Sequence, residues 1–356
     1  MRVIPPLEVT DARLTSSTVP DAVAATYDGA TNYGVGDLAG AATTYGNPQS
    51  VFRSLQTPNT GNTQVEGAFW TFAGLVYPVW SGSSSAAIGG IVTDLATNSL
   101  YESLVASNNF ALDNVADDIA KWKYIGKTNR FRMFDYSRSE PTITGQTLTI
   151  VFAAGKRMNA MGLKGMKANA FDITVTSVGG GGTVRTASGS LNTRDTQTWS
   201  DYFFGEFGTI PSLAYFDIPP YTDAIVTITL TSTSSPVEIG AIVFGTFVFI
   251  GRTIQSTSSD VLNFSTVERD EDGNAILTPR RNVPKSRQQV LCAKSNVNKV
   301  IDVREKLNAT PALWYGLADS TDGYFDAVTI LGIYKAFEIN TDTPLDAIVS
   351  LELEEV

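Results

Sequence analysis

Four aromatic residues in the first third of the chain could form a carbohydrate-binding surface: Tyr33, Trp70, Trp122 and Tyr124. Flat rings stack on the apolar faces of sugars, and a ring buried at a contact contributes a large area. The same rings could instead form the cores of small β units, in which one Trp supplies most of the apolar surface. The core interpretation is the stronger one for Trp70 and Trp122, and the two are balanced for Tyr33 and Tyr124.

Residues suited to other chemistry are scarce. The chain contains no His, which removes the usual base of a Ser or Cys triad and the commonest zinc ligand. Glu66, Asp113, Asp117 and Asp118 could supply the carboxylate pair of a glycosidase, but no pattern indicates that two of them meet, so we interpret them as surface acids. Residues 270–274 (DEDGN) lack the ligand spacing of a calcium loop and predict a hairpin turn. We expect no catalytic residue, metal site or cofactor.

The composition predicts a mainly β protein with an uncharged surface. Of 356 residues, 43% are hydrophobic and only 17% are charged, against a usual charged fraction of about 25%. The net charge of −10 argues against nucleic-acid binding, which needs a concentrated basic footprint. The most apolar stretch, residues 239–250, is far shorter than the ~20 residues of a membrane-spanning helix. We therefore expect no membrane insertion.

Residues 1–6 have no apolar core long enough for a signal peptide, so we expect synthesis in the cytoplasm and exit by lysis or within a particle. The single cysteine, Cys292, cannot form an intrachain disulfide and is expected to be a small buried residue. Residues 345–356 carry four acids and no basic residue. We interpret them as a solvated edge strand, with docking on a basic partner as the alternative.

The four rings fall within a degenerate duplication. Its matching segments are VFRSL at 51–55 with LYESL at 100–104, Asn59 with Asn108, FW at 69–70 with KW at 121–122, and Gly74 with Gly126. Each unit has an apolar strand, a polar loop and a Trp strand, which is too little chain to bury much of its own surface. We predict two small β modules, at residues 27–75 and 76–127, attached to a larger body.

Three further segments complete the predicted organisation. Residues 1–26 contain Pro5 and Pro6, which force extended backbone, and we expect an extended arm that packs on a neighbour. Residues 128–252 contain alternating runs, of which 244–249 (FGTFVF) reads as one buried strand, and predict a jelly-roll-like β-sandwich. Residues 253–356 predict a strand, a helix and further strands in β-α-β-β order, an α+β assembly domain.

The first module resembles the short chitin-binding, type-3 carbohydrate-binding fold of glycosidases and phage tail proteins. The resemblance rests on Tyr33-x-x-Gly36-Asp37, Phe52 and Phe69-Trp70, and the second copy keeps Gly89, Tyr101 and Trp122 without the Gly-Asp pair. It implies contact between the modules and host cell-surface polysaccharide, through Tyr33, Trp70, Trp122 and Tyr124.

Nearly the whole chain is similar to a family of structural proteins of tailed bacteriophages. The motifs, in order, are MRVIPPL at 1–7, YESL at 101–104, GxTNRFxMFD at 126–135, WxDYFF at 199–204, PPY at 219–221 and ATPxLWYG at 309–316. The resemblance implies a virion component of the tail tip, baseplate or fibre-attachment region, with copies of itself and other tail proteins as partners and no enzymatic residues. A glycan-binding lectin or a polysaccharide hydrolase accessory protein is the alternative.

Overall fold

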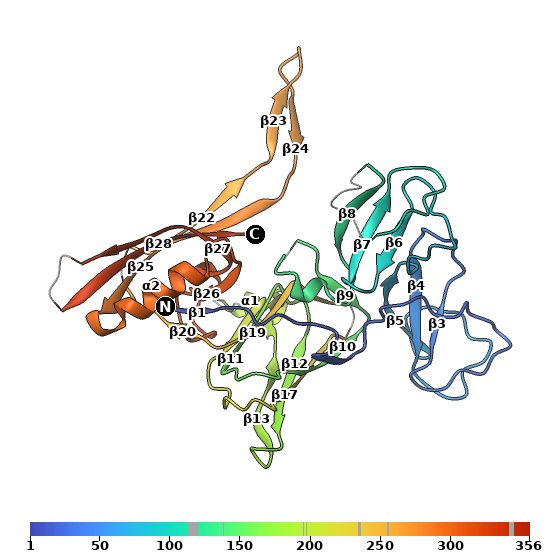
Figure 1. Ribbon diagram of the computed structural model, residues 1–356, viewed down its shortest axis with the longest axis horizontal. Coiled ribbons are helices and arrows are strands. Elements are labelled where there is room, and N and C mark those ends of the chain that lie inside the picture. The colour runs from blue at the N-terminus through green and yellow to red at the C-terminus, as the bar shows by residue number, and fades with distance from the viewer. Residues whose placement is uncertain are drawn as a thin grey trace.

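A computed structural model describes residues 1–112, 120–137, 139–194, 196, 198–233, 236–254, 256–341 and 345–356. The protein is mainly β, with 46% strand and 7% helix, which confirms the predicted class. Two small modules lie at one end, a β-sandwich lies in the centre and a large sheet lies at the other end (Figure 1). Within the described residues, no helix is long and apolar enough to cross a membrane.

Each module is built on a three-stranded antiparallel sheet whose strands follow chain order. The first contains β3 (Leu38–Gly40), β4 (Gln49–Ser54) and β5 (Trp70–Val76), and the second contains β6 (Ile91–Asp94), β7 (Ser99–Ser103) and β8 (Trp122–Lys127). The first module is fastened to the body by backbone pairing, because Gly145 N–H donates to Phe72 O (2.6 Å). The Thr144 hydroxyl also donates to Ala73 O (3.0 Å).

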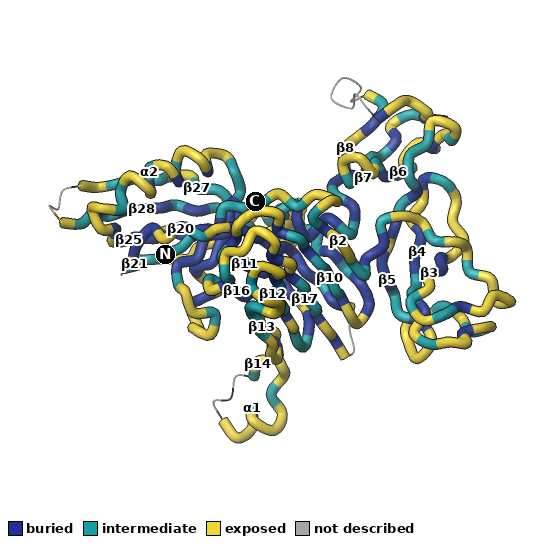
Figure 2. The backbone as a smooth tube through the Cα atoms, turned by 60° about the horizontal axis from the view of Figure 1, so that its bottom comes forward, coloured by how far each residue is buried: buried dark blue, intermediate teal, exposed yellow. Residues whose placement is uncertain are grey.

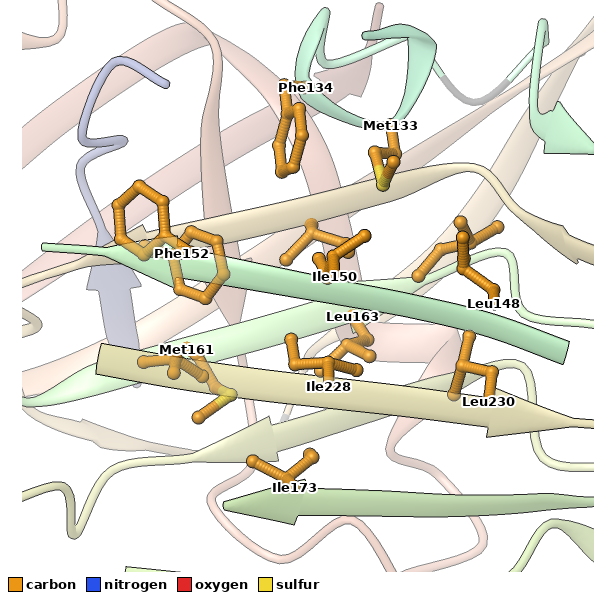
Figure 3. Close-up of a cluster of buried hydrophobic side chains, with 14 of the residues drawn as sticks. Met133, Phe134, Leu148, Ile150, Phe152, Met161, Leu163, Ile173, Ile228 and Leu230 are labelled. Atoms are coloured by element: carbon orange, nitrogen blue, oxygen red, sulfur yellow. The ribbon is translucent and has the colours of Figure 1, made fainter. Parts of the chain in front are cut away.

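The central sandwich packs a five-stranded sheet against a three-stranded one. The larger sheet, in spatial order, is β13 (Gly182–Ser190), β12 (Ala170–Ser177), β17 (Ile225–Thr231), β10 (Thr147–Ala153) and β2 (Leu14–Ser17); the smaller is β16 (Ser212–Tyr215), β11 (Ala160–Lys164) and β19 (Ala241–Gly245). Inward-pointing residues of both sheets form the core (Figure 3). Its tightest contact is a stack of Phe152 on Phe244, with ring centroids 4.1 Å apart.

The chain changes sheet at β10–β11–β12 and again at β16–β17, as in a jelly roll, whereas the hairpin β12–β13 stays within the larger sheet. The prediction of one buried strand at residues 244–249 is wrong. Strand β19 ends at Gly245, and β20 (Val248–Phe249) belongs to the large terminal sheet. At this point the chain lies against the backbone of Pro5, whose carbonyl oxygen leaves no room for a Cβ at Gly245.

The terminal sheet has eight strands in the order β20, β1, β26, β27, β28, β25 and β21, with β22 also pairing with β25. Its strands other than β20 are β1 (Arg2–Ile4), β21 (Arg252–Thr253), β22 (Ser258–Asn263), β25 (Asn282–Ala293), β26 (Ala312–Tyr315), β27 (Thr329–Asn340) and β28 (Asp346–Glu355). Helix α2 (Val297–Lys306) follows β25 and buries Val300 and Val303. The order β25, α2, β26, β27 is the predicted β-α-β-β arrangement.

The remaining elements are short. They are β9 (Thr142–Thr144) paired with β18 (Val237–Ile239), β14 (Asn192–Thr193) with β15 (Gly208–Thr209), β23 (Thr266–Arg269) with β24 (Ala275–Thr278), helix α1 (Trp199–Phe204), and three 3₁₀ turns at Arg132–Phe134, Lys294–Asn296 and Asp326–Val328. Cys292 is fully buried in the core of the terminal sheet, as expected for a small apolar residue.

The sequence predicts that residues 1–26 extend towards a neighbour, but in the structure they pack on their own chain. Strand β1 inserts between β20 and β26, where Val3 and Ile4 are fully buried. Strand β2 then forms the edge of the larger sandwich sheet through pairing with β10. Residues 1–26 therefore join two bodies of their own chain, because their apolar residues find cores there.

The acidic final strand is not an edge, so that prediction is wrong. Strand β28 lies between β27 and β25, and basic residues of both neighbours pair with its acids. Lys285 Nζ lies 2.9 Å from Glu352 Oε1. This hydrogen bond and the charge of Lys285 lower the pKa of Glu352. Lys335 Nζ lies 3.4 Å from Glu354 Oε1. The balancing charges lie on other strands, so a local reading of residues 345–356 misses them.

The smaller sandwich sheet is buried on both faces. On β11, Met161 and Leu163 enter the sandwich core, whereas Ala160 packs in a second core shared with the terminal sheet. Gly162 lies on that second face. A Cβ at Gly162 would lie 2.0 Å from the Tyr315 hydroxyl oxygen and 2.4 Å from Leu313 Cδ2. The two sheets can approach this closely because the residue between them has no side chain.

We predict that Gly162→Ala destabilises the protein by roughly 1–3 kcal/mol, because overpacking forces side chains and backbone to shift. Urea denaturation followed by fluorescence measures this change. The matched control is Gly323→Ala, since a Cβ there meets no atom within 4 Å. Equal stability of the two variants would contradict the close approach of the sheets.

Candidate interaction surfaces

The two module tryptophans are core residues, which confirms the stronger of the two interpretations. The sugar contact that the resemblance implies for them is wrong. Trp70 is fully buried, its indole N–H donates to Asn62 O (2.9 Å), and its ring meets the edge of Tyr33 at 5.0 Å. Trp122 is also buried, and its N–H donates to Phe110 O (3.1 Å). Each indole is the largest member of a small apolar cluster, which contains Tyr33 and Ala39 in the first module and Ala86, Val92 and Leu112 in the second.

Tyr33 is also a core residue, so the sugar contact predicted for it is wrong too. Its ring stacks on Tyr27 at 5.8 Å, and its hydroxyl accepts the backbone N–H of Asp28 (2.9 Å). The second module has no equivalent ring. Tyr33 forms a bridge with Asn59, and at the corresponding bridge to Asn108 the residue is Ala86. The duplication is therefore incomplete at this position.

The registers of the two modules define which residues correspond. Ser54 pairs with Trp70, Phe52 with Phe72 and Val51 with Gly74 in the first module; Ser103 pairs with Trp122, Tyr101 with Tyr124 and Leu100 with Gly126 in the second. Both strand pairs carry an irregularity at the same place, and both glycines have positive φ, +146° and +159°. Tyr124 thus corresponds to Phe72, and each module carries one edge-to-face ring pair. The other ring of each pair, Phe52 or Tyr101, packs against the core of its module.

Of the four candidate rings, only Tyr124 is exposed, with 54% of its surface accessible. It meets Tyr101 edge to face, with ring centroids 5.8 Å apart. Partial burial raises the pKa of Tyr124, and the negative charge of Asp135 raises it further. A ring pair bordered by a carboxylate could contact a sugar through stacking and a hydrogen bond.

Of the carboxylates considered for catalysis, Glu66 is the one that lies within the described residues. Glu66 Oε1 accepts the Thr71 hydroxyl (2.8 Å) and Oε2 accepts the Phe72 N–H (2.6 Å), so both oxygens bind neighbouring groups of β5. Asp113, Asp117 and Asp118 lie outside the described residues. In the described part of the chain, no group of three or more His, Cys, Asp or Glu could hold a metal ion.

A large exposed aromatic cluster, which was not predicted, lies on residues 192–209, and we call this segment the aromatic loop. The pairing of β14 with β15 closes the loop, and none of the residues of helix α1 at its tip is buried. Trp199 and Phe204 are 80% and 86% exposed. The other exposed rings are Tyr202, Phe203 and Phe207.

Specific contacts link the described residues of the aromatic loop to one another. Thr198 and Asp201 form a capping box, with the Asp201 N–H donating to Thr198 Oγ1 (3.1 Å) and the Thr198 N–H donating to Asp201 Oδ2 (2.8 Å). Arg194 donates to Gly205 O (3.0 Å), and its guanidinium lies 4.8 Å from the centroid of the Phe207 ring. The spacing of the rings at 199, 202 and 203 predicts one helical face, a signal the sequence offered.

A second projecting element is the hairpin formed by the outer parts of β22 and β25 with β23 and β24, residues 261–284, which we call the arm. It projects away from the terminal sheet (Figure 1). Every residue of β23 and β24 is exposed. The apolar ones along the arm are Val261, Phe264, Val267, Ile276 and Leu277. At the tip, the carboxylate of Asp270 accepts the N–H of Asp272 (3.1 Å) and of Asn274 (2.7 Å), the predicted hairpin turn.

Comparison of the chain with protein-family models, with curated proteins and with solved structures finds no match.

We predict that Trp122→Ala and Tyr124→Ala differ sharply. Removing the buried indole costs about 3–5 kcal/mol and opens the second module, whereas truncating the exposed Tyr124 costs less than about 1 kcal/mol. Hydrogen exchange in β6, β7 and β8 measures the opening. If Tyr124 contacts glycan, Tyr124→Ala loses retention on polysaccharide while the module stays protected. Protection in Trp122→Ala equal to that of the wild type would show that the indole is not the module core.

The free energy of unfolding depends on pH through the carboxyl group of Asp135. Burial raises its pKa from 3.8 to about 6, and Glu140 adds to this, although the Ser137 N–H and the charges of Arg132 and Lys127 oppose it. The folded state therefore holds a proton that the unfolded state releases, and stability falls as the pH rises from about 4 to about 6.

We predict that Asp135→Asn lacks this decline, which amounts to about 1–2 kcal/mol after allowance for partial exposure. Urea denaturation of both proteins at several values between pH 4 and pH 7 measures it. Identical pH profiles for the wild type and the variant would contradict the assignment.

Proposed function

We propose that this protein is a structural subunit of a bacteriophage tail, located in the virion at the tail tip, baseplate or fibre-attachment region. It would assemble with copies of itself and with other tail proteins. The ordered motifs from residues 1–7 to residues 309–316 support the family. The proposal includes no enzymatic step, no nucleic acid and no membrane insertion.

The observation that carries the proposal is the arm. A two-stranded hairpin is marginally stable in water by itself, yet this one extends well beyond the sheet with apolar side chains along its length. Val267 and Leu277 lie directly opposite each other in the register, so they share one face of the hairpin. Exposed apolar surface of this kind marks a contact with another protein. A projecting, unsupported arm suits a subunit that is held by its neighbours.

The rest of the architecture suits a scaffold. The sandwich and the terminal sheet share a packed core, which makes the body rigid. The modules are attached by backbone hydrogen bonds at the opposite end from the terminal sheet (Figure 1). In this proposal the modules hold a fibre or contact host cell-surface polysaccharide, and Tyr124 with Tyr101 is the surface that would do so.

One observation favours the alternative of a glycan-binding lectin, namely the exposed ring pair of Tyr101 and Tyr124. A lectin would bind polysaccharide as a free protein and would lose that binding in Tyr124→Ala. The alternative of a polysaccharide hydrolase accessory protein draws no support from Glu66, whose two oxygens are engaged locally.

We expect the protein in purified particles of the phage that encodes it, with immunogold label for residues 27–127 at the tail end. Val267→Thr together with Leu277→Thr keeps strand propensity but removes the apolar face of the arm, so particles complemented with this variant should lack the protein. Glu268→Thr, on the opposite face of the hairpin, is the matched control and should be incorporated. Absence of the wild-type chain from particles by mass spectrometry would overturn the proposal.

A further inference from the structure

We propose that the aromatic loop of one copy docks into a groove beside helix α2 of a second copy. This inference rests on the proposed self-assembly of the chain and names one contact that would produce it.

The groove lies between helix α2 and the short edge strand β20, and its volume is about 390 Å³. Its apolar lining comes from Pro5, Val248, Val303 and Leu307. Cavities of ~300–1,000 Å³ hold drug-sized ligands, so this groove has room for aromatic side chains. Its floor is continuous with the core of the terminal sheet, since Val303 and Leu307 are members of that core. A ring that enters it would therefore meet fixed apolar atoms.

The aromatic loop supplies suitable rings. Buried Phe, Tyr and Trp side chains each cover about 150–250 Å², so the three rings on one helical face, Trp199, Tyr202 and Phe203, could bury roughly 500 Å². This is the larger part of the ~800 Å² that a stable interface buries on each partner. Because the capping box and Arg194 hold the loop in place, docking would require little further ordering.

The charges of the two surfaces are complementary. Residues 192–209 contain Asp195, Asp201 and Glu206 against the single base Arg194. The groove is flanked by Lys299 and Lys306, both exposed, with Asp302 between them. Neither lysine forms an ion pair with any described residue. Complementary charge at the rim of an interface sets orientation and partner choice. Glu206, which lies between two exposed rings, would meet a lysine when those rings enter the groove.

The loop cannot fill the groove of its own chain. Helix α1 lies at the end of a projection from the sandwich, well separated from helix α2 (Figure 2). The donating and accepting surfaces therefore differ, and each copy can donate one loop and accept another. Such head-to-tail contacts close into a ring or continue as a filament. This arrangement suits a subunit of a tubular assembly.

The test uses the purified full chain carrying Val267→Thr and Leu277→Thr, so that the arm makes no contribution. We expect this background to form oligomers in multi-angle light scattering. Trp199→Ser with Phe203→Ser removes the donor, and Lys299→Glu with Lys306→Glu alters the acceptor. Each pair of changes should weaken self-association at least tenfold, and thermal unfolding should be unchanged.

Mixing the donor-defective and acceptor-defective chains decides the matter, because the first keeps an intact groove and the second an intact loop. The mixture should form a complex of two subunits and nothing larger. Glu206→Lys added to the acceptor-defective chain should restore longer assembly by reversing both charges. Tyr324→Ser removes an equally exposed ring outside both surfaces and should leave assembly unchanged.

A mixture that behaves as the sum of its parts would overturn the docking. Monomers in the arm-variant background would also overturn it, whereas oligomers of the wild-type chain would then attribute self-association to the arm. The presence of the protein in particles tests the proposed function separately. The two failures are therefore distinguishable.

Discussion

The architecture depends on one sheet that must pack on both faces. Strands β16, β11 and β19 present large side chains such as Met161, Leu163 and Phe244 to the sandwich core, and small ones such as Ala160 and Ala241 to the terminal sheet. Alternation along a strand makes this division possible, since successive side chains point to opposite faces. Lys164 completes the second face by donating from Nζ to Thr329 O (2.8 Å), which satisfies a buried backbone carbonyl. This middle layer admits no extra atom at Gly162. The five-stranded sandwich sheet and the terminal sheet therefore hold a fixed position relative to each other, and so do the bases of the elements that project from them.

The projecting elements follow a different principle from the body. In the body, apolar side chains pack against other residues of the same chain. In the aromatic loop and the arm they are exposed, although local hydrogen bonds hold the backbone there. The capping box of α1 and the Asx-type turn at Asp270 order these tips without burying their side chains. The modules combine buried and exposed aromatic side chains. Their indoles are buried, but one edge-to-face ring pair in each remains at the surface or at the junction with the sandwich.

The sequence predicted features that depend on local pattern. The class, the duplication, the helix that follows β25 and the burial of Cys292 all follow from periodicity or from residue type. It failed where the decisive partner is remote. The acids of β28 are balanced by Lys285 and Lys335 on neighbouring strands, and β1 pairs with β26 at the far end of the chain. Composition alone could not separate a stacking Trp from a core Trp, because both need an apolar ring beside polar loops.

The place of β1 has a consequence for biosynthesis. This strand is synthesised before the modules and the sandwich, yet its partner β26 and the central strand β28 follow both of them. The modules need only their own consecutive strands and can fold as they emerge, whereas the terminal sheet must await β26 and β28. Until then Val3 and Ile4 lack the neighbours that bury them. The modules can therefore fold before the terminal sheet is complete.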